Sequence, residues 1–326
     1  MTINVIAKLE GGLGNQLFQY AIAKKISCDL NYHLILDIGV VTNQHDDRQL
    51  SLFNYKIDST TISLDHNMSL HPKTAIEKFG LKDVDIIIED KSLDVLRMAS
   101  LISKSTYLIG WWQSYKYIES IKDTLRDEIY PKNTKNSSFN EAKFWIESKK
   151  NTVAVHIRRG DSIYNYGMLP KSYYFDAIKL LMEKISMPEI IYFSDDPVWV
   201  ENELVTRYRG HIISSKWDLK VYEELALMSL CDHHIIANST FSWWGCWLKK
   251  NENGISIRPS PWFGTFNDIV DEEKICPESW LIVNLTEKIT TKSHTVYWWW
   301  RALKYRLSNY MAVLKFKGKN INFKNI

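Results

Sequence analysis

Between residues 153 and 250, short apolar runs alternate with longer segments in which apolar side chains recur at helical spacing. This alternation constrains the fold strongly, because strands separated by helices form parallel sheets with helices on both faces. The expected strands are residues 153–157, 190–194, 211–214 and 234–237, and the expected helices are residues 172–185, a helix opening at Pro197, residues 221–230 and residues 243–250. The sequence therefore predicts an α/β fold.

The N-terminal segment predicts a second unit of the same kind. Residues 3–9 are strand-like, residues 10–16 form a glycine-rich turn, residues 17–30 have helical periodicity, and residues 34–37 give another strand. This order is that of a βαβ unit. Residues 41–105 lack a clear pattern and are expected to mix helices with long loops.

A chain of 326 residues is long enough for two domains, each with its own core. The polar stretch at residues 131–138 resembles a linker. We therefore expect an N-terminal domain over residues 1–148, a C-terminal domain over residues 149–287 and a tail over residues 288–326.

Charge is distributed unevenly along the chain. The net charge is +3, but the segment from Lys288 onward has nine Lys/Arg and no Asp or Glu, which leaves 32 basic and 38 acidic residues before it. A mildly acidic body argues against nucleic-acid binding. The tail, which includes Trp298, Trp299 and Trp300, predicts a basic, aromatic helix that either lies on an anionic membrane or packs on the body.

The four cysteines, Cys28, Cys231, Cys246 and Cys276, are widely spaced, with no CxxC pair and no histidine at zinc-ligand spacing. They are expected to be reduced core residues. The N-terminus enters a strand at once, without a basic leader segment, and no apolar run reaches the length of a membrane span. These features predict a cytoplasmic protein.

A cluster of charged side chains lies at the end of the expected strand 153–157. His156, Arg158, Arg159 and Asp161 occupy a position that commonly faces a ligand in α/β sheets. Guanidinium groups stay charged and match the oxygens of a diphosphate. The alternative is a surface salt-bridge cluster in which Asp161 neutralises one arginine, and the segment alone leaves both open.

The glycine-rich turn is a second candidate anion site. Gly11, Gly12 and Gly14 precede an expected helix start, where free backbone N–H groups favour negative charge. The turn lacks the Gly-Lys-Ser/Thr of a P-loop and the third glycine of the dinucleotide fingerprint. A tight turn that requires positive φ explains the glycines equally well.

A third candidate is the polar run Asn238, Ser239, Thr240 and Ser242, which joins a strand to a helix. These side chains either cap the helix or, with its N–H groups, hold a phosphate. Capping accounts for one of them rather than four. The tryptophans that follow are expected in the core: Trp243, Trp244 and Trp247.

Two acidic pairs receive structural interpretations. Asp195 and Asp196 follow an expected strand, and we expect them to cap the next helix rather than to act in acid–base chemistry. Asp83 and Asp85 match a metal-binding DxD pattern, but the apolar run comes after the pair rather than before it. We therefore expect a turn there and no metal site.

Taken together, four motifs make the chain resemble the α-1,2-fucosyltransferases, chiefly the bacterial members (glycosyltransferase family 11). They are GGLGNQLFQY at residues 11–20, HIRRGD at 156–161, YFSD at 192–195 and NSTFSWW at 238–244. The resemblance implies a GT-B-like fold of two Rossmann-like domains facing a cleft, with the short basic, aromatic helical tail appended. Donor binding would then lie mainly in the C-terminal domain and acceptor binding mainly in the N-terminal one.

The resemblance also implies roles for individual residues. Arg158 and Arg159 would bind phosphate, His156 would lie near the nucleoside, and Glu224 would bind guanine. Arg158 would stabilise the departing diphosphate, and Asp161 would be the catalytic base or would orient the arginines. The remaining donor-binding residues would be Gly14, Asn15, Asn238, Ser239, Thr240 and Ser242.

The implied reaction is the inverting transfer of L-fucose from GDP-β-L-fucose to the 2-hydroxyl of a terminal galactose, without a cofactor or divalent metal. The acceptor would belong to an O-antigen or other surface polysaccharide, possibly in lipid-linked form, and the enzyme would work in the bacterial cytoplasm, with the tail as a peripheral membrane contact. The alternatives are another linkage, another GDP-sugar, or a non-catalytic carbohydrate-binding protein that uses its aromatic residues.

Overall fold

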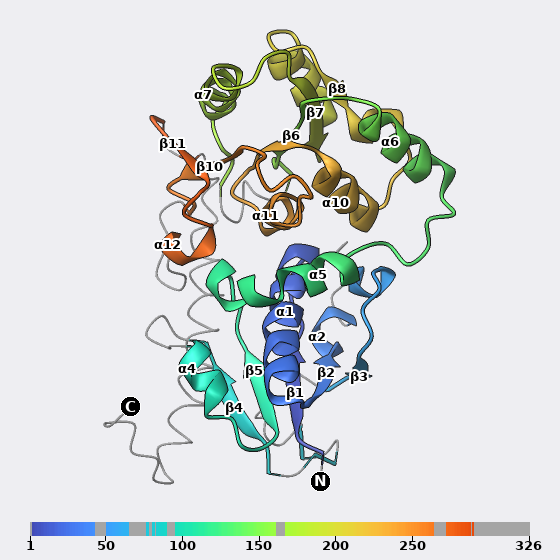
Figure 1. Cartoon of the computed structure of the whole chain (residues 1–326), viewed down its shortest axis with the longest axis vertical. Helices are drawn as coiled ribbons and strands as arrows, with labels where there is room; N and C mark the ends of the chain where they lie inside the picture. The colour runs from blue at the N-terminus through green and yellow to red at the C-terminus, as the bar shows by residue number, and fades with distance from the viewer. Residues whose placement is uncertain are drawn as a thin grey trace.

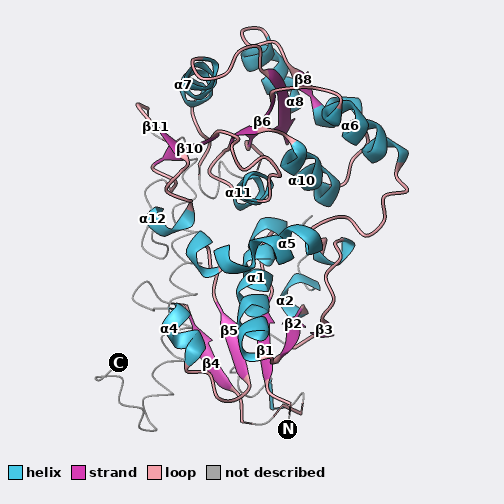
Figure 2. Cartoon of the chain, in the orientation of Figure 1, coloured by secondary structure: helices cyan, strands magenta, loops and turns pink. Residues whose placement is uncertain are grey.

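The structure, a computed structural model, describes residues 2–42, 50–64, 76–77, 80–81, 83–89, 95–160, 167–263, 272–287 and 289. Asp161 and, apart from residue 289, the predicted tail lie outside these residues, so membrane attachment stays a prediction. Figures 1 and 2 show two α/β halves arranged along the long axis of the molecule, with α11 at the level where they meet.

The N-terminal half is built on a five-stranded parallel sheet with the order β3-β2-β1-β5-β4. Its strands are β1 (Asn4–Lys8), β2 (His33–Asp37), β3 (Thr60–Ile62), β4 (Asp85–Ile88) and β5 (Thr106–Ile109). The expected βαβ unit is confirmed as β1, α1 (Leu13–Leu30) and β2. Helix α1 begins four residues before the expected position because Gly12 serves as its N-cap, with extended backbone and a carbonyl that accepts from the N–H groups of Asn15 and Gln16.

The C-terminal half is built on a six-stranded parallel sheet with the order β11-β10-β9-β6-β7-β8. Its strands are β6 (Thr152–Ile157), β7 (Glu189–Ser194), β8 (His211–Ile212), β9 (His233–Ile235), β10 (Ser256–Ser260) and β11 (Leu281–Asn284). Two parallel sheets with intervening helices confirm the predicted GT-B-like α/β fold. The chain passes between the sheets after Ile109 and before Thr152, and the domain boundary at residue 148 stays a prediction.

The remaining helices connect and cover the strands. In the N-terminal half they are α2 (Gly39–Thr42), α4 (Val95–Ser100) and α5 (Lys122–Glu128), with 3-10 turns at Leu52–Asn54, Tyr115–Tyr117 and Glu119–Ile121. In the C-terminal half they are α6 (Ser137–Glu147), α7 (Lys171–Met182), α8 (Pro197–Val200), the π-helical turn Glu201–Val205, α9 (Ile213–Lys216), α10 (Val221–Leu230), α11 (Thr240–Trp247) and α12 (Glu272–Ile275).

Two local expectations are corrected. The strand expected over residues 211–214 is only two residues long, because the chain turns into α9 at Ile213, a side chain buried in the core. The linker expected over residues 131–138 is shorter, because the Asn136 side chain accepts from Ser138 N–H and caps α6. The last residues of the polar stretch, from Asn136 on, therefore belong to a capped helix start rather than to a linker.

A continuous hydrophobic core joins the two halves. Phe18 of α1 contacts Trp243 and Trp244 of α11, with ring centroids 4.5 and 5.0 Å apart. Trp243 also stacks on Trp247 at 5.5 Å. The prediction that the tryptophans of α11 belong to the core is confirmed, since all three are buried.

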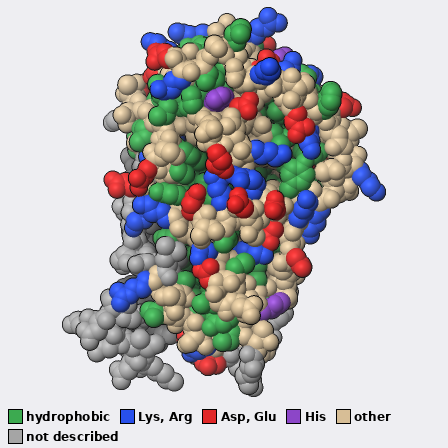
Figure 3. Space-filling view, in the orientation of Figure 1, with side chains coloured by type: hydrophobic (Ala, Val, Ile, Leu, Met, Phe, Trp, Pro, Cys, Tyr) green, Lys and Arg blue, Asp and Glu red, His purple; other side chains and the backbone are tan. Residues whose placement is uncertain are grey.

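The cysteine prediction holds for three of the four side chains. Cys231, Cys246 and Cys276 are buried, whereas Cys28 is exposed near the C-terminal end of α1, so its placement in the core was wrong. No helix in the described ranges is long and apolar enough to cross a bilayer. Figure 3 shows basic and acidic side chains interspersed on the viewed face, without a broad patch of one sign.

Candidate functional site

The glycine-rich turn and the polar run after β9 lie in direct contact, although more than 200 residues separate them in the sequence. The indole Nε1 of Trp244 donates to the Gly14 carbonyl oxygen at 3.0 Å. A Cβ at Gly14 would lie 2.5 Å from the Thr240 carbonyl carbon and 2.6 Å from Phe241 N. Gly14 is therefore required for the close approach of two backbones. Gly11, with φ +78°, supports the tight-turn interpretation for that position.

This contact brings the N-termini of α1 and α11 together. The N-cap residues, Gly12 and Ser239, make no side-chain capping hydrogen bond. The first-turn N–H groups of a helix have no partners within the helix, and the helix dipole adds partial positive charge at this end. Two adjacent uncapped helix starts favour an anionic ligand.

Asn15 connects the two helix starts to a third segment. Its Oδ1 accepts a hydrogen bond from the Thr240 hydroxyl at 3.0 Å and another from Gln113 Nε2 at 3.1 Å. Gln113 follows β5 in the N-terminal half and is buried. The amide of Asn15, which is partly exposed, is thus held from both halves of the protein.

His156 lies near the end of β6 and is buried and neutral. Burial, together with the positive charge of Arg158, lowers its pKa to about 3. Its Nδ1 has no hydrogen-bond partner among the described residues, and its ring centroid lies 5.5 Å from that of Phe241. A buried ring nitrogen without a partner, next to the α11 start, is suited to a hydrogen bond from or to a ligand.

Two arginines and two aspartates meet where the parallel strands β6 and β7 end. Arg158 Nη1 lies 3.2 Å from Asp195 Oδ2, and Arg159 Nε lies 3.1 Å from Asp196 Oδ2. The guanidinium of Arg159 also packs over the Trp199 ring at 4.1 Å. The salt-bridge alternative is therefore realised with Asp195 and Asp196, while Asp161 lies outside the described residues.

Asp195 and Asp196 have different structural roles. Asp196 Oδ1 accepts from Trp199 N–H at 3.1 Å, so the predicted helix cap is confirmed for Asp196 at the start of α8. Asp195 instead accepts from the N–H groups of Arg159 and Gly160 at 2.8 and 3.2 Å. Asp195 thereby fixes the backbone that carries the arginines, and for this residue the cap prediction was wrong.

Glu224 lies in the first turn of α10, partly buried near the same cluster. Burial, together with the negative charge of Asp195, raises its pKa to about 7. Among the described residues, no side chain or backbone group donates to its carboxylate. Ionising a carboxylate in such surroundings, without a donor among the described residues, costs free energy. Carboxylates of this kind are typical of functional sites.

The other residues predicted for the site are less accessible. Ser242 is fully buried, and its hydroxyl donates to the carbonyls of Ser239 at 3.2 Å and Ala237 at 3.4 Å. Asn238 is also buried, and its Nδ2 donates to Gly167 O at 3.4 Å. Ser239 and Thr240 are partly exposed at the helix start. The structure thus brings Gly14, Asn15, Ser239 and Thr240 together and places Ser242 behind them.

Sequence reasoning missed Gln113 and Glu89. Glu89 Oε2 accepts from the N–H groups of Trp111 and Trp112 at 2.6 and 2.9 Å, and burial raises its pKa. Both residues come from parts of the chain without clear periodicity. No signal in the sequence pairs them with the glycine-rich turn, because their partners are distant in sequence.

The DxD pattern lies where the chain enters β4, so the turn that was expected covers Asp83 but not Asp85, the first residue of the strand. Asp83 has φ +53° and precedes β4, and both Asp83 and Asp85 pair with Lys104 Nζ at 3.0 Å. Within the described ranges, no group of three or more His, Cys, Asp or Glu side chains is arranged to hold a metal ion.

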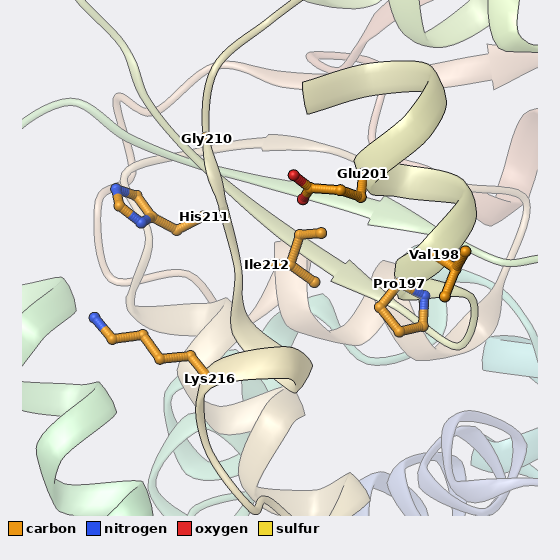
Figure 4. Close-up of a pocket in the computed structure, with 7 residues that line it drawn as sticks. All are labelled: Pro197, Val198, Glu201, Gly210, His211, Ile212 and Lys216. Carbon is orange, nitrogen blue, oxygen red and sulfur yellow. The ribbon is translucent and has the colours of Figure 1, made fainter. Parts of the chain in front are cut away.

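A pocket of about 470 Å³ lies beside the edge strand β8 (Figure 4). Its lining residues are Pro197, Val198, Glu201, Gly210, His211, Ile212 and Lys216. None of them belongs to the predicted site. The pocket is therefore separate from the candidate site at the N-termini of α1 and α11.

Comparison with known proteins agrees with the motifs. The family model described as glycosyl transferase family 11 matches residues 77–283. An α-1,2-colitosyltransferase of Escherichia coli is 34% identical over 292 residues, covering 85% of this chain and 98% of that protein. The O-antigen biosynthesis glycosyltransferase WbnK of Escherichia coli is 31% identical over 301 residues, covering 84% of this chain and 98% of that protein.

Among solved structures, the fucosyltransferase NodZ from Bradyrhizobium aligns with a TM-score of 0.47 at 12% identity, covering 75% of this chain and 93% of that one. Family membership rests on the sequence comparisons, which span most of the chain at more than 30% identity. The chain belongs to glycosyltransferase family 11 and is a glycosyltransferase.

Proposed function

We propose that this enzyme transfers L-fucose from GDP-β-L-fucose, with inversion, to the 2-hydroxyl of a terminal galactose on a surface-polysaccharide repeat unit such as an O-antigen. The names of its relatives support the proposal. They include an α-1,2-colitosyltransferase, an O-antigen biosynthesis glycosyltransferase and, at 24% identity over 45% of this chain, a galactoside 2-alpha-L-fucosyltransferase of Caenorhabditis elegans.

The observation that carries the proposal is the meeting of the α1 and α11 N-termini. Two uncapped helix starts in contact would form a site for a diphosphate. Around it, Gly14, Asn15, Ser239 and Thr240 would hold phosphate oxygens together with Arg158. Arg159 would set the position of its neighbour through Asp196 and Trp199.

The nucleoside would be bound by His156 and Glu224. A neutral imidazole with an unpartnered Nδ1 is suited to a ribose hydroxyl. The Glu224 carboxylate, which has no donor among the described residues, would accept from guanine N1–H and N2–H. Both groups lie in weakly solvated surroundings, so each hydrogen bond to the nucleoside would contribute to affinity, since neither group has another partner among the described residues.

The chemistry follows from where charge develops. As fucose leaves through an oxocarbenium-like transition state, negative charge accumulates on the β-phosphate of GDP. Arg158 and the two helix starts would stabilise that charge, so we propose that no divalent metal is required. Transfer that continues at its full rate in excess EDTA is expected, and loss of transfer that Mg²⁺ or Mn²⁺ restores would refute this point.

The acceptor hydroxyl must lose a proton during transfer. Asp161, outside the described residues, remains the proposed base. The Asp161→Asn variant should retain GDP affinity and lose most turnover. Near-normal turnover would remove Asp161 from this role and leave a phosphate oxygen of the donor as the base.

The direct test is a transfer assay with purified protein, labelled GDP-fucose and a panel of galactose-terminated oligosaccharides. The product should carry fucose α-linked to the 2-position of galactose, as determined by NMR linkage analysis. Fucose at another position would refute the proposed linkage. Retained oligosaccharide binding with neither GDP binding nor sugar release would favour a non-catalytic binding protein.

A second donor is favoured by one comparison. The 34% identical relative is a colitosyltransferase, and colitose is fucose without its 3-hydroxyl. The same assay should therefore include GDP-colitose beside GDP-fucose. A kcat/KM ratio that favours colitose by tenfold or more would assign the enzyme to colitose transfer at the same site.

A further inference from the structure

Gln113 makes a contact that the proposed donor site does not by itself explain. It belongs to the N-terminal half, is only 6% exposed, and donates through Nε2 to Asn15 Oδ1. The Thr240 hydroxyl, from the C-terminal half, donates to the same oxygen. Two donors from opposite halves of the protein therefore converge on one amide oxygen.

This arrangement determines which end of the Asn15 amide remains available. An asparagine amide has one accepting oxygen and one donating nitrogen, which exchange places when the group rotates by half a turn. With Oδ1 occupied by two donors, Nδ2 is left as a donor, and no described residue accepts a hydrogen bond from it. Rotation would direct the Nδ2 hydrogens at Gln113 Nε2, which cannot accept a hydrogen bond, and would leave that donor unsatisfied. The Thr240 hydroxyl can accept as well as donate, so the contact with Gln113 is the one that distinguishes the two orientations.

We propose that Gln113 is a positioning residue for the diphosphate site, because it orients the Asn15 amide so that Nδ2 donates to a phosphate oxygen of the nucleotide. This inference rests on the proposed GDP-sugar donor. Diphosphate oxygens accept hydrogen bonds and repel a carbonyl oxygen, so the orientation of the amide decides between attraction and repulsion.

The segment around Gln113 is built to hold this side chain in place. Glu89 accepts from the N–H groups of Trp111 and Trp112, and Trp112 has φ +55°. A Cβ at Gly110 would lie 2.4 Å from Glu89 Cβ, so only glycine allows the carboxylate to approach so closely. A partly buried carboxylate therefore fixes the turn that directs Gln113 toward Asn15.

A second contact joins the same segment to the glycine-rich turn. Gln19 Nε2 donates to Gly110 O at 3.2 Å, and Gln19 Oε1 accepts from Glu10 N–H at 2.9 Å. The Trp111 ring also lies close to Gly11, 3.2 Å from the position that a Cβ there would occupy. The turn after β5 and the turn after β1 thus behave as one packed unit, in which Gln113 supplies the polar contact to Asn15.

The principal test is Gln113→Met, which preserves size and removes the donor. Isothermal titration with GDP, in the absence of acceptor, should show affinity reduced by roughly 3–10-fold, the loss expected for one hydrogen bond. Gln113→Glu should lose more, because a carboxylate draws the Asn15 Nδ2 to itself and turns Oδ1 toward the diphosphate. If GDP affinity were unchanged in both variants, the proposal would be refuted.

Ser114→Ala is the matched control. It removes one buried hydrogen bond of the same turn, from Ser114 Oγ to Lys274 O at 2.9 Å, without touching Asn15. GDP affinity should remain that of the wild type. An equal loss in Ser114→Ala and Gln113→Met would mean that general loosening of the turn, rather than amide orientation, causes the effect, and would overturn the proposal.

A double-mutant cycle separates orientation from other effects. In the Asn15→Ala background, Gln113→Met should cost no further GDP affinity, because there is no amide left to orient. The same loss in both backgrounds would overturn the proposal. Should Gln113→Met unfold, Gln113→Leu, which also lacks the donor, replaces it in the same cycle, and its loss of GDP affinity must likewise vanish in the Asn15→Ala background.

The outcomes also distinguish this inference from the proposed function. GDP binding with the expected coupling but without fucose transfer refutes only the proposed reaction. GDP binding without coupling refutes only the role of Gln113. A wild-type protein that does not bind GDP refutes both.

Discussion

Arg158 and Arg159 are neighbours in sequence, but their side chains lie in different surroundings. Arg159 is fixed between the Asp196 carboxylate and the Trp199 ring, and its side chain is 22% exposed. Arg158 pairs with Asp195 and is 39% exposed. The more exposed guanidinium has more room to reach a nucleotide, so we propose charge stabilisation for Arg158 and support for Arg159.

The first prediction concerns Arg158→Lys. Replacing a planar, two-pronged donor by a point charge should lower kcat by roughly 10²–10³-fold. The thermal unfolding midpoint should stay near that of the wild type, because the ion pair with Asp195 is partly exposed. Steady-state kinetics with GDP-fucose provide the measurement, and a kcat within a factor of three of wild type would contradict the assignment.

The second prediction uses the raised pKa of Glu224. An ionised carboxylate is needed to accept from guanine, so GDP affinity should rise as pH increases through about 7 and weaken below it. Glu224→Gln should reduce GDP affinity by roughly 10–100-fold at pH 8, since hydrogen bonds to a charged group are lost. Titration calorimetry between pH 5.5 and 8.5 would test both statements, and pH-independent binding would exclude Glu224.

As pH rises, the free energy of unfolding should fall while GDP affinity rises. The pKa of Glu224 is raised above its ordinary value of 4.5, so its contribution to stability is fully present below that value and is lost as pH rises through about 7. Relative to wild type, the Gln variant should therefore gain roughly 1–3 °C in unfolding midpoint between pH 5 and pH 8. An equal midpoint difference at both pH values would argue against a buried, ionising Glu224.

At the scale of elements, the site depends on how closely α1 and α11 approach. Gly14 has no room for a side chain, whereas Gly12, two residues earlier, has nothing within 4 Å of a built Cβ and an ordinary φ of −74°. The glycines of the turn are therefore not equivalent. Only some of them are required by the contact between the halves.

The third prediction compares these two positions. Gly14→Ala should force the helix starts apart, destabilise the protein by about 1–3 kcal/mol through overpacking, and weaken GDP binding. Gly12→Ala should cost less, about 0.5–1 kcal/mol, because alanine is the poorer N-cap but meets no neighbouring atom. Chemical denaturation of both variants provides the measurement, and equal stability of the two would show that the helices have room to separate.

Sequence periodicity located most elements of the C-terminal half but not all of their ends. The helix expected over residues 221–230 matches α10, because its apolar spacing is regular and it begins after Lys220. Helix α11 begins at Thr240, three residues before the expected position, because the polar residues Thr240 and Ser242 interrupt the apolar pattern of its first turn. Apolar periodicity therefore underestimates a helix that begins with polar side chains.

At the scale of the whole molecule, the hydrophobic cluster around α1 and α11 spans both halves. Side chains of α1 and α11 pack into one cluster, which also includes Trp280 just before β11, 5.9 Å from the Trp243 ring. Interfaces between independent domains are usually smaller and more polar. The aromatic contact therefore predicts that the halves unfold together.

The fourth prediction is a single calorimetric unfolding transition for the wild type. Phe18→Ala, which removes the ring between Trp243 and Trp244, should destabilise the protein by about 3–5 kcal/mol and split or broaden the transition. Phe139→Ala, in the separate core beneath α6, is the control and should lower the midpoint without splitting it. Two resolved transitions in the wild type would contradict the shared core.

The sequence by itself determined the alternation of strands and helices, the parallel α/β class and the motifs near the site. Apolar periodicity and turn chemistry are local properties, and they specify elements such as β6 and α10 before any packing is known. Tertiary structure decided the rest. It paired Arg158 with Asp195 at the end of the neighbouring strand β7, and it placed Asn15 against Thr240 and Gln113. Such contacts depend on the order of strands in the sheets and on how two cores pack together, and no local pattern encodes a distance between residues 225 positions apart.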